Sequence, residues 1–480
     1  MKPTDVLGTR TTVGKALDVN LDIKKYGAFA EIGAGQEVAR FFFQAGKASA
    51  TIAKTMSAYD MVYSDEIYGK EKSGRYVCES RVQKMLEKEF QLLQRRLDAT
   101  RGPDSEFFAF ANTVATGSVS SRESQGWLGV RFQTSPRSEA SEITIHIRML
   151  DRNRIQQQET LGVLGVNLIH SSFYHRDSLA EFLSFLMEHL RPEQVAIDFI
   201  RISGPAFATL DMREMNLELV MRGLTELMLF EPNSPTSYFP DVVFGKPLLI
   251  QRGSFRPITR THMDVLVKGA AQFQKEGADK TALSFFEMDI SPEISKFPIV
   301  EKEDGERKPT ELNAALKQSL LTRISLINTL HLPVLVSQCR YFYQLKRACR
   351  KYSAKKMALV VGASKLEKLF DESFYRHLEG GILEGLGKLL DDQTAIYVYP
   401  HKTDKICLTS QTMNFPEPLQ KLYRFFLEKR QIFDIAGCDE IEEFFHSRDV
   451  FDEIASGGRE WLKHVPSELH GAIEANKKSL

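Results

Sequence analysis

Apolar and polar positions in the C-terminal half of this 480-residue chain follow two alternating patterns. Short apolar runs are separated by longer segments in which apolar residues recur at helical spacing. Such runs predict buried strands, and the segments between them predict helices. The expected strands are residues 247–250, 283–290, 333–336, 357–362 and 395–399. Because strands that alternate with helices form parallel sheets, we expect a Rossmann-like parallel α/β sheet here.

The N-terminal half shows a different pattern. Residues 79–97 carry Val82, Met85, Leu86 and Phe90 on one helical face. In residues 127–133 and 143–149, apolar and polar positions alternate, which predicts two strands. The polar loop between them indicates an antiparallel pair. The N-terminal half is therefore expected to be an α+β domain.

A polar segment with two prolines, PNSPTS at residues 232–237, lies between these halves. Two prolines in a polar run disfavour regular structure. We therefore expect a linker there, with an N-terminal domain of residues 1–235 and a C-terminal domain of residues 236–480. The sequence does not indicate the role of the first domain.

Composition narrows the classes of partner. The chain is 42% hydrophobic and 26% charged with a formal net charge of +0, which is typical of a globular protein. Without a basic excess, nucleic acid is not expected as a partner. No apolar run has the length of a membrane helix, and the N-terminus lacks the apolar core of a signal peptide. We expect a cytoplasmic protein without a membrane partner, and a homo-oligomer stays open.

The cysteines and histidines give little sign of a metal site or a disulfide framework. The 5 cysteines are scattered and form no CxxC pair. They are expected to be unpaired thiols of a protein in a reducing compartment. His170 and His175 have no carboxylate cluster nearby in the sequence, so we expect no metal held by the protein itself.

The strongest chemical signal lies in residues 246–273, where an apolar run, a glycine turn and a helical pattern follow one another. We expect Thr261 to begin the helix as its N-cap, with Asp264 completing a capping box. Backbone amides at such a turn, together with the positive end of a helix dipole, bind phosphate. Gly253 would let the backbone approach a ligand closely. The candidate nucleotide-binding residues are Gly253, Ser254, Phe255, Arg256 and Arg260.

The residues GSFRPITRTH, from Gly253 to His262, resemble the GSFNPxT/HxxH signature of the nucleotidylyltransferase superfamily. The resemblance is greatest to nicotinamide and nicotinate mononucleotide adenylyltransferases. It implies that Thr259 and His262 act as catalytic residues by contacting the triphosphate of ATP. It also implies Mg²⁺ as the metal of ATP, a mononucleotide acceptor, release of pyrophosphate and a role in NAD biosynthesis.

This chain departs from the family pattern at two places. Arg256 stands where the signature has asparagine, and Thr261 stands where a glycine often precedes the second histidine. The family's second phosphate motif has the form SxTxxR. Its best counterpart here is the segment 409–412, which supplies Ser410 and Thr412 but no arginine.

A second glycine turn lies near the N-terminus, in EIGAG at residues 31–35. It resembles the first motif of methyltransferases that use S-adenosylmethionine. Glu37 replaces the expected third glycine, and a bulky acid there would crowd and repel an anionic ligand. The alternative to cofactor binding is a turn that brings residues 41–43 into the core.

Three functions therefore remain open. The first is nucleotidyl transfer from ATP to a mononucleotide by the C-terminal half, with the N-terminal half supplying substrate selection or assembly. The second is a nucleotide-binding or assembly protein without turnover on a Rossmann-like scaffold, and the third is a methyltransferase. Several blocks, including FAEIGAGQEVARFFF and RGSFRP, also resemble a bacterial family whose mechanism is not established.

Overall fold

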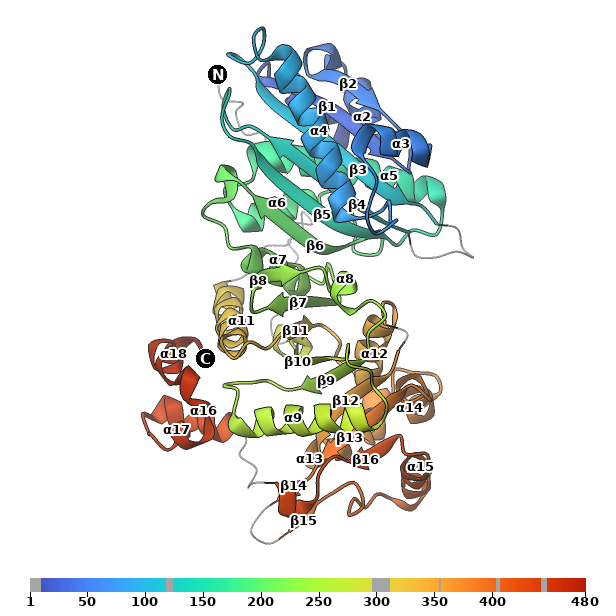
Figure 1. Ribbon diagram of the computed structural model, residues 1–480, viewed down its shortest axis with the longest axis vertical. Helices are drawn as coiled ribbons and strands as arrows, with labels where there is room; N and C mark the ends of the chain where they lie inside the picture. The colour runs from blue at the N-terminus through green and yellow to red at the C-terminus, as the bar shows by residue number, and fades with distance from the viewer. Residues whose placement is uncertain (1–9, 118–123, 296–310, 354, 403–405, 442–446) are drawn as a thin grey trace. The chain divides into compact units, whose positions relative to one another are not determined.

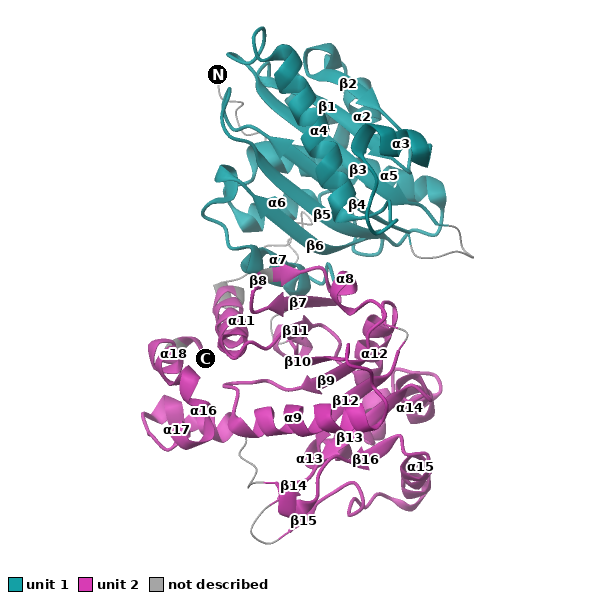
Figure 2. Ribbon diagram, in the orientation of Figure 1, with its two compact units in different colours: residues 1–225, 302–307 teal, residues 226–301, 308–480 magenta. Residues whose placement is uncertain are grey.

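The computed structural model describes residues 10–117, 124–295, 311–353, 355–402, 406–441 and 447–480. The chain divides into two compact units, and the division falls between Thr225 and Glu226 (Figure 2). Each unit buries one of the chain's 2 tryptophans, Trp127 in the first and Trp461 in the second. Within the described residues, no helix combines the length and the apolar character that crossing a membrane requires.

The first unit is built on a six-stranded sheet in the order β2-β1-β3-β4-β5-β6 (Figure 1). Strands β1, β2 and β3 are parallel, and β3 to β6 form an antiparallel meander. The expected antiparallel pair is confirmed as β4 and β5, in which Trp127 lies opposite His146. The strand bounds are β1 (Lys25–Ile32), β2 (Ile52–Met56), β3 (Glu106–Ala115), β4 (Ser124–Phe132), β5 (Ser141–Met149) and β6 (Val195–Ser203).

Helices pack on this sheet through the apolar faces that the sequence predicts. The helix expected at residues 79–97 is α4, with these bounds, and it packs against β3, β4 and β1. Its residues Val82, Met85 and Leu86 are fully buried. The helices of this unit are α1 (Thr12–Leu21), α2 (Glu37–Ala45), α3 (Met61–Tyr68), α4 (Glu79–Leu97), α5 (Arg154–Tyr174), α6 (Leu179–Leu186) and α7 (Met212–Met221).

The second unit contains the Rossmann-like sheet, so the expected fold class is confirmed. Its strand order is β16-β13-β12-β9-β10-β11-β7-β8. The six strands from β16 to β11 are parallel, and β7 and β8 add an antiparallel edge. The strand bounds are β7 (Leu227–Glu231), β8 (Ser234–Ser237), β9 (Leu248–Arg252), β10 (Leu283–Asp289), β11 (Val334–Ser337), β12 (Met357–Gly362), β13 (Thr394–Tyr399) and β16 (Ile432–Asp434); the short hairpin β14 (His401–Lys402) and β15 (Cys407–Leu408) lies outside the sheet.

Counted along the chain, the six parallel strands lie in the order 3-2-1-4-5-6 of a dinucleotide-binding fold. The first of them is β9 and the fourth is β12, and these two strands are neighbours. The direction of winding reverses between them. In an open α/β sheet, ligands bind at the carboxyl ends of the strands at such a reversal.

Helices cover both faces of this sheet. On one face, α9 lies with Gly269 against Val360 and Leu249. On the other face, alternate strand residues such as Ile250, Leu359 and Val398 form a core with α12, α14 and α15. The helices of this unit are α8 (Phe239–Val243), α9 (Arg260–Lys275), α10 (Ser291–Ile294), α11 (Glu311–Thr329), α12 (Phe342–Arg350), α13 (Ala363–Leu369), α14 (Gly381–Leu389), α15 (Glu417–Glu428), α16 (Ser447–Ser456), α17 (Trp461–His464) and α18 (His470–Ala475).

The segment 232–237 does not lack regular structure, so that expectation is wrong. Residues Ser234–Ser237 form β8, which pairs antiparallel with β7. Proline cannot donate to a strand ladder, but β8 is an edge strand, where a missing donor is tolerated. Thr236 is fully buried, which ties the segment to the second unit.

Candidate functional site

The loop between β9 and α9, residues 253–259, holds most of the candidate nucleotide-binding residues. Since β9 is the first strand of the 3-2-1-4-5-6 order, this loop lies at the carboxyl end of the sheet where the winding reverses. The helix that follows is 16 residues long, and its N-terminus adjoins the loop. The fold therefore places the motif where ligands bind in related α/β sheets.

Phe255 shapes the loop from inside. Its backbone has a φ of +45°, in the left-handed region, and its ring is fully buried against Phe286 and His262, at centroid distances of 4.8 and 5.0 Å. A Cβ on Gly253 would lie 2.7 Å from this ring, so glycine is required there by the packing of Phe255. The amide of Gly253 also donates to the carbonyl of Glu287 at 3.0 Å, which extends the β9–β10 ladder.

The backbone amides of Ser254 and Phe255 donate no hydrogen bond to the described part of the chain. The Ser254 side chain is exposed, and its hydroxyl lies 3.5 Å from that of Ser447 at the start of α16. Unpaired donors of this kind are stabilised by water or by an anion. The loop thus offers two amides beside the positive end of a long helix dipole.

Thr259 and His262 form the capping box of α9. The helix begins at Arg260 with Thr259 as N-cap, so the expectation that Thr261 caps it with Asp264 is wrong. The amide of His262 donates to the Thr259 hydroxyl at 3.4 Å, and His262 Nδ1 accepts from the Thr259 amide at 3.1 Å. The chain enters the helix two residues earlier than the apolar spacing indicates, because the imidazole supplies the acceptor that a glutamate or glutamine usually supplies.

The capping box determines the tautomer of the neutral His262 side chain. Thr259 is fully buried, and its hydroxyl lies 2.8 Å from His262 Nδ1. Because Nδ1 accepts a hydrogen bond, the neutral imidazole carries its proton on Nε2. A contact between His262 and a phosphate would therefore use the Nε2 proton.

Arg256 and Arg260 are exposed and contact the C-terminal helical segment 447–480. Arg256 Nε donates to the main-chain oxygen of Leu480 at 2.6 Å, and its guanidinium lies 4.4 Å from the centre of the Phe451 ring. Arg260 Nε donates to the main-chain oxygen of Val465 at 3.3 Å. Arg256 in the loop and Arg260 at the start of α9 are thus both held by main-chain oxygens.

Arg323, on α11, is a residue that the sequence analysis missed. Only 2% of it is exposed, and it donates to the carbonyl of Ser254 at 3.0 Å. A signal was present in the sequence, because Arg323 adjoins the apolar stripe of Leu320, Ile324 and Ile327. Arginine is rarely buried unless it has partners, so its place beside that stripe indicates a specific role.

Arg252, the last residue of β9, joins this strand to β10 and to the segment that follows β11. Its guanidinium donates to both oxygens of the buried Glu287 carboxylate, at 2.6 and 3.0 Å, and to the carbonyl of Cys339 at 2.7 Å. A two-pronged pair of this geometry is rigid. The loop 253–259 therefore starts from a fixed point.

In the counterpart of the second phosphate motif, Ser410 and Thr412 already form hydrogen bonds with other residues of the chain. Ser410 is fully buried, and its amide and hydroxyl both donate to Asp434 at 2.7 Å. The Thr412 hydroxyl accepts from the Thr409 amide at 2.8 Å. Burial raises the pKa of Asp434, while its hydrogen bonds to Ser410 oppose that rise.

Two cysteines near this turn form a disulfide, so the expectation of five unpaired thiols is wrong. Cys407 and Cys438 are bonded, with their Cα atoms 6.2 Å apart. They lie 31 residues apart in sequence, but they follow the neighbouring strands β13 and β16. Cys78, Cys339 and Cys349 are unpaired.

The N-terminal glycine turn follows β1 and leads into α2. The carboxylate of Glu31 is fully buried and accepts from the amides of Val38 and Ala39 at 3.2 and 2.9 Å. Burial raises the pKa of Glu31 to about 7, against these hydrogen bonds, which lower it. Gly33 has a φ of +103°, and a Cβ there would lie 1.8 Å from the Val114 oxygen. The acid of this motif thus caps the helix itself.

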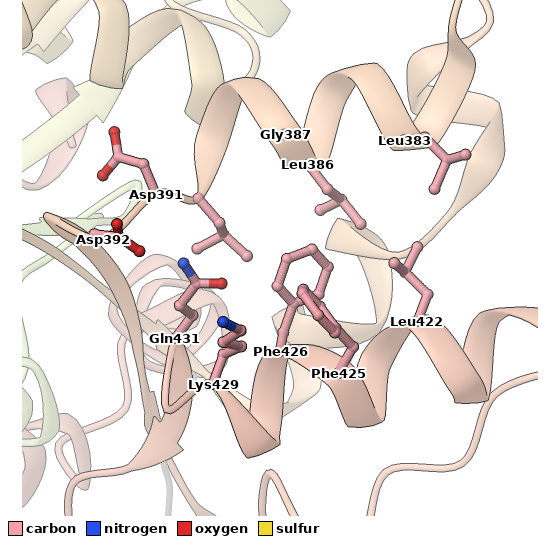
Figure 3. Close-up of a pocket in the computed structure, with 11 residues that line it drawn as sticks. Leu383, Leu386, Gly387, Asp391, Asp392, Leu422, Phe425, Phe426, Lys429 and Gln431 are labelled. Atoms are coloured by element: carbon pink, nitrogen blue, oxygen red, sulfur yellow. The ribbon is translucent and has the colours of Figure 1, made fainter.

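A groove of about 370 Å³ lies between α14 and α15 (Figure 3). Its walls are apolar, and charged and amide side chains gather at one end. None of its lining residues belongs to the loop 253–259 or to the capping box. The lining residues are Leu383, Leu386, Gly387, Leu390, Asp391, Asp392, Leu422, Phe425, Phe426, Lys429 and Gln431.

In the part of the chain that the structure describes, His, Cys, Asp and Glu side chains nowhere gather in threes in an arrangement that could hold a metal ion.

No family model matches the chain, and no curated protein matches it. Among solved structures, the competence/damage inducible protein CihA from Agrobacterium tumefaciens is 14% identical and aligns over 33% of this chain and 93% of its own, with a TM-score of 0.24. A competence-damaged protein (CinA) superfamily protein from Klebsiella pneumoniae is 12% identical and covers 35% and 99%, with a TM-score of 0.27. The Plasmodium falciparum nicotinic acid mononucleotide adenylyltransferase complexed with APC is 12% identical and covers 48% and 97%, with a TM-score of 0.25. Likenesses of this size determine neither substrate nor reaction.

Proposed function

We propose that the loop 253–259 and the start of α9 bind the phosphates of a nucleotide, and that the chain transfers a nucleotidyl group from ATP to a mononucleotide. One observation carries this proposal. The amides of Ser254 and Phe255 are unpaired within the described chain, at the carboxyl end of β9, where the winding of the sheet reverses. An anion at this point gains both amides and the dipole of α9.

In the proposed reaction, a phosphate oxygen of the mononucleotide attacks the α-phosphorus of ATP. The bond from the α-phosphorus to the bridging oxygen breaks, and pyrophosphate leaves. Such transfers depend on positioning and charge stabilisation more than on covalent help. Mg²⁺ enters with ATP as part of the substrate, because it is bound largely by substrate phosphates and water.

The chain's own residues have separate roles in this scheme. The amides of Ser254 and Phe255 hold one phosphate, and Arg256 and Arg260 add charge after exchanging their main-chain oxygens for phosphate oxygens. Charge-assisted hydrogen bonds of arginine to phosphate are stronger than those to neutral carbonyls. His262 donates its Nε2 proton to a developing negative charge. Nicotinate and nicotinamide mononucleotide are the acceptors that we propose, with NAD synthesis as the setting.

The test is a titration of the full chain with ATP and Mg²⁺ by calorimetry, followed by a pyrophosphate assay with each mononucleotide. We expect ATP binding and pyrophosphate release that depends on one of the two acceptors. A chain that binds neither ATP nor inorganic tripolyphosphate would contradict the proposed site.

A second candidate is a nucleotide-binding or assembly protein without turnover. It is favoured by the capping contacts of Thr259 and His262 and by the engagement of Ser410 with Asp434. Each of these side chains already has a partner within the chain. ATP binding without pyrophosphate release, with either acceptor present, would support this candidate over the enzyme.

A further inference from the structure

Two guanidinium groups, those of Arg256 and Arg323, lie near one another at the loop 253–259. Arg323 lies beneath the loop, 2% exposed, with hydrogen bonds to the carbonyl oxygens of Ser254 at 3.0 Å and Ser319 at 3.4 Å. Its carboxylate partner is Glu293, at 3.4 Å. Arg256 is close enough to repel it: burial lowers the pKa of Arg323, Glu293 raises it, and Arg256 lowers it again. A buried arginine beside a second arginine favours an anion nearby.

An oxygen already occupies this place. The main-chain oxygen of Leu480 accepts from Arg256 Nε at 2.6 Å and from the Ser319 hydroxyl at 3.0 Å. Ser319 lies one helical turn before Arg323 on α11. Arg256 and Ser319 thus both donate to one oxygen near Arg323, and a phosphate oxygen at this place would meet the same two donors.

We propose that Arg256, Ser319 and Arg323 form a subsite for the terminal phosphate of a polyphosphate ligand, and that the main-chain oxygen of Leu480 holds this subsite in the present conformation. The inference rests on the proposed nucleotide site and names its substrate class, a polyphosphate. Arg323 donates to the carbonyl of Ser254, so its guanidinium lies next to the residue whose amide we propose to bind a phosphate. Arginine suits such a ligand, because its guanidinium binds phosphate oxygens through charge-assisted hydrogen bonds.

The experiment compares the affinities of ATP, ADP, AMP and inorganic tripolyphosphate by calorimetry, for the wild type and for Arg323→Met, Arg323→Lys and Arg256→Met. Arg347→Met is the matched control, since it removes the same charge from an exposed arginine on α12. We expect Arg323→Met and Arg256→Met to weaken ATP and tripolyphosphate about tenfold or more, because each removes a charged donor. AMP affinity should stay unchanged, and Arg323→Lys should recover part of the loss.

Other outcomes separate the alternatives. Equal weakening of ATP and AMP by Arg323→Met would show that Arg323 only shapes the loop, and would overturn the subsite. Unchanged ATP binding in both methionine variants would overturn it as well. Arg256 is exposed, so its variant keeps the test available if Arg323→Met does not fold. A wild type that binds none of the four ligands would contradict the proposed function itself.

The role of Leu480 has its own measurement. A chain without residues 477–480 lacks the competing oxygen, and we expect it to bind tripolyphosphate severalfold more tightly than the wild type. Weaker or equal binding would show that Leu480 supports the loop and does not compete with the ligand.

Discussion

His262 serves two purposes at one position. Its Nδ1 closes the capping box with Thr259, and its Nε2 proton is the group that we propose to contact phosphate. A loss of function on replacing this histidine with alanine would therefore have two explanations. Glutamine separates them, because it supplies the usual capping-box acceptor at the third helical position but lacks the imidazole.

We expect His262→Ala to lower the free energy of unfolding by about 1 kcal/mol, and His262→Gln to leave it nearly unchanged. Pyrophosphate release should fall on the order of a hundredfold in both variants, as when one preorganised donor is lost. Urea unfolding and the pyrophosphate assay provide the two readouts. Full turnover in His262→Gln would assign the histidine to helix capping alone.

Glu31 makes the stability of the first unit depend on pH. Burial raises its pKa from an ordinary value of 4.5 to about 7, so the folded chain holds this proton more tightly than the unfolded chain. Its contribution is complete below about pH 4.5 and is lost as the pH rises through 7. The expected loss is about 3 kcal/mol.

The variant Glu31→Gln tests this expectation, because it cannot titrate. We expect the difference in unfolding free energy between wild type and variant to shift with pH between 5 and 8, in favour of the wild type at low pH. Urea unfolding of both proteins at pH 5 and at pH 8 measures this difference in unfolding free energy. A difference that is the same at both values would contradict the raised pKa.

Among the elements, those with strong local patterns were predictable. The strands β9 to β13 and the helix α4 have apolar runs or stripes that local spacing reveals. The three-residue strand β16 and the edge strand β8 were missed, because one is too short for a pattern and the other contains Pro235. The start of α9 was misplaced by two residues, since spacing alone does not show that a histidine completes the cap.

The disulfide could not be predicted from the sequence, because its two cysteines meet only through the pairing of β13 with β16. Closing a loop of this length stabilises a chain by about 3–4 kcal/mol in the loop-entropy model. We expect the double variant Cys407→Ala, Cys438→Ala to lose stability of that order in urea unfolding. Cys78→Ala, which removes an unpaired thiol, should change it by less than about 0.5 kcal/mol.

A thiol count gives an independent check on the same bond. Unfolded without reductant, the chain should expose three reactive thiols, those of Cys78, Cys339 and Cys349. Five reactive thiols under these conditions would contradict the pairing.

For the whole molecule, alternation of strands and helices predicted a parallel sheet but not its order. The order 3-2-1-4-5-6 arises from pairings between distant segments, such as β9 with β12, which lie more than one hundred residues apart. The order matters for the site, because it puts the loop 253–259 at the reversal of winding. The residues of the motif were found from local sequence. The partners Arg323, Ser319 and Leu480 were not, because helices from other parts of the chain bring them there.

Each compact unit contains one tryptophan, so the fluorescence of each tryptophan reports on the unfolding of its own unit. In Trp461→Phe, fluorescence follows only the half with Trp127, and in Trp127→Phe only the half with Trp461. Each half has its own sheet and core, so we expect the two variants to unfold at different urea concentrations. ATP should raise the midpoint reported by Trp461 with its concentration, as binding linkage requires, and leave that of Trp127 in place. Coincident curves that respond together to ATP would mean that the halves unfold as one.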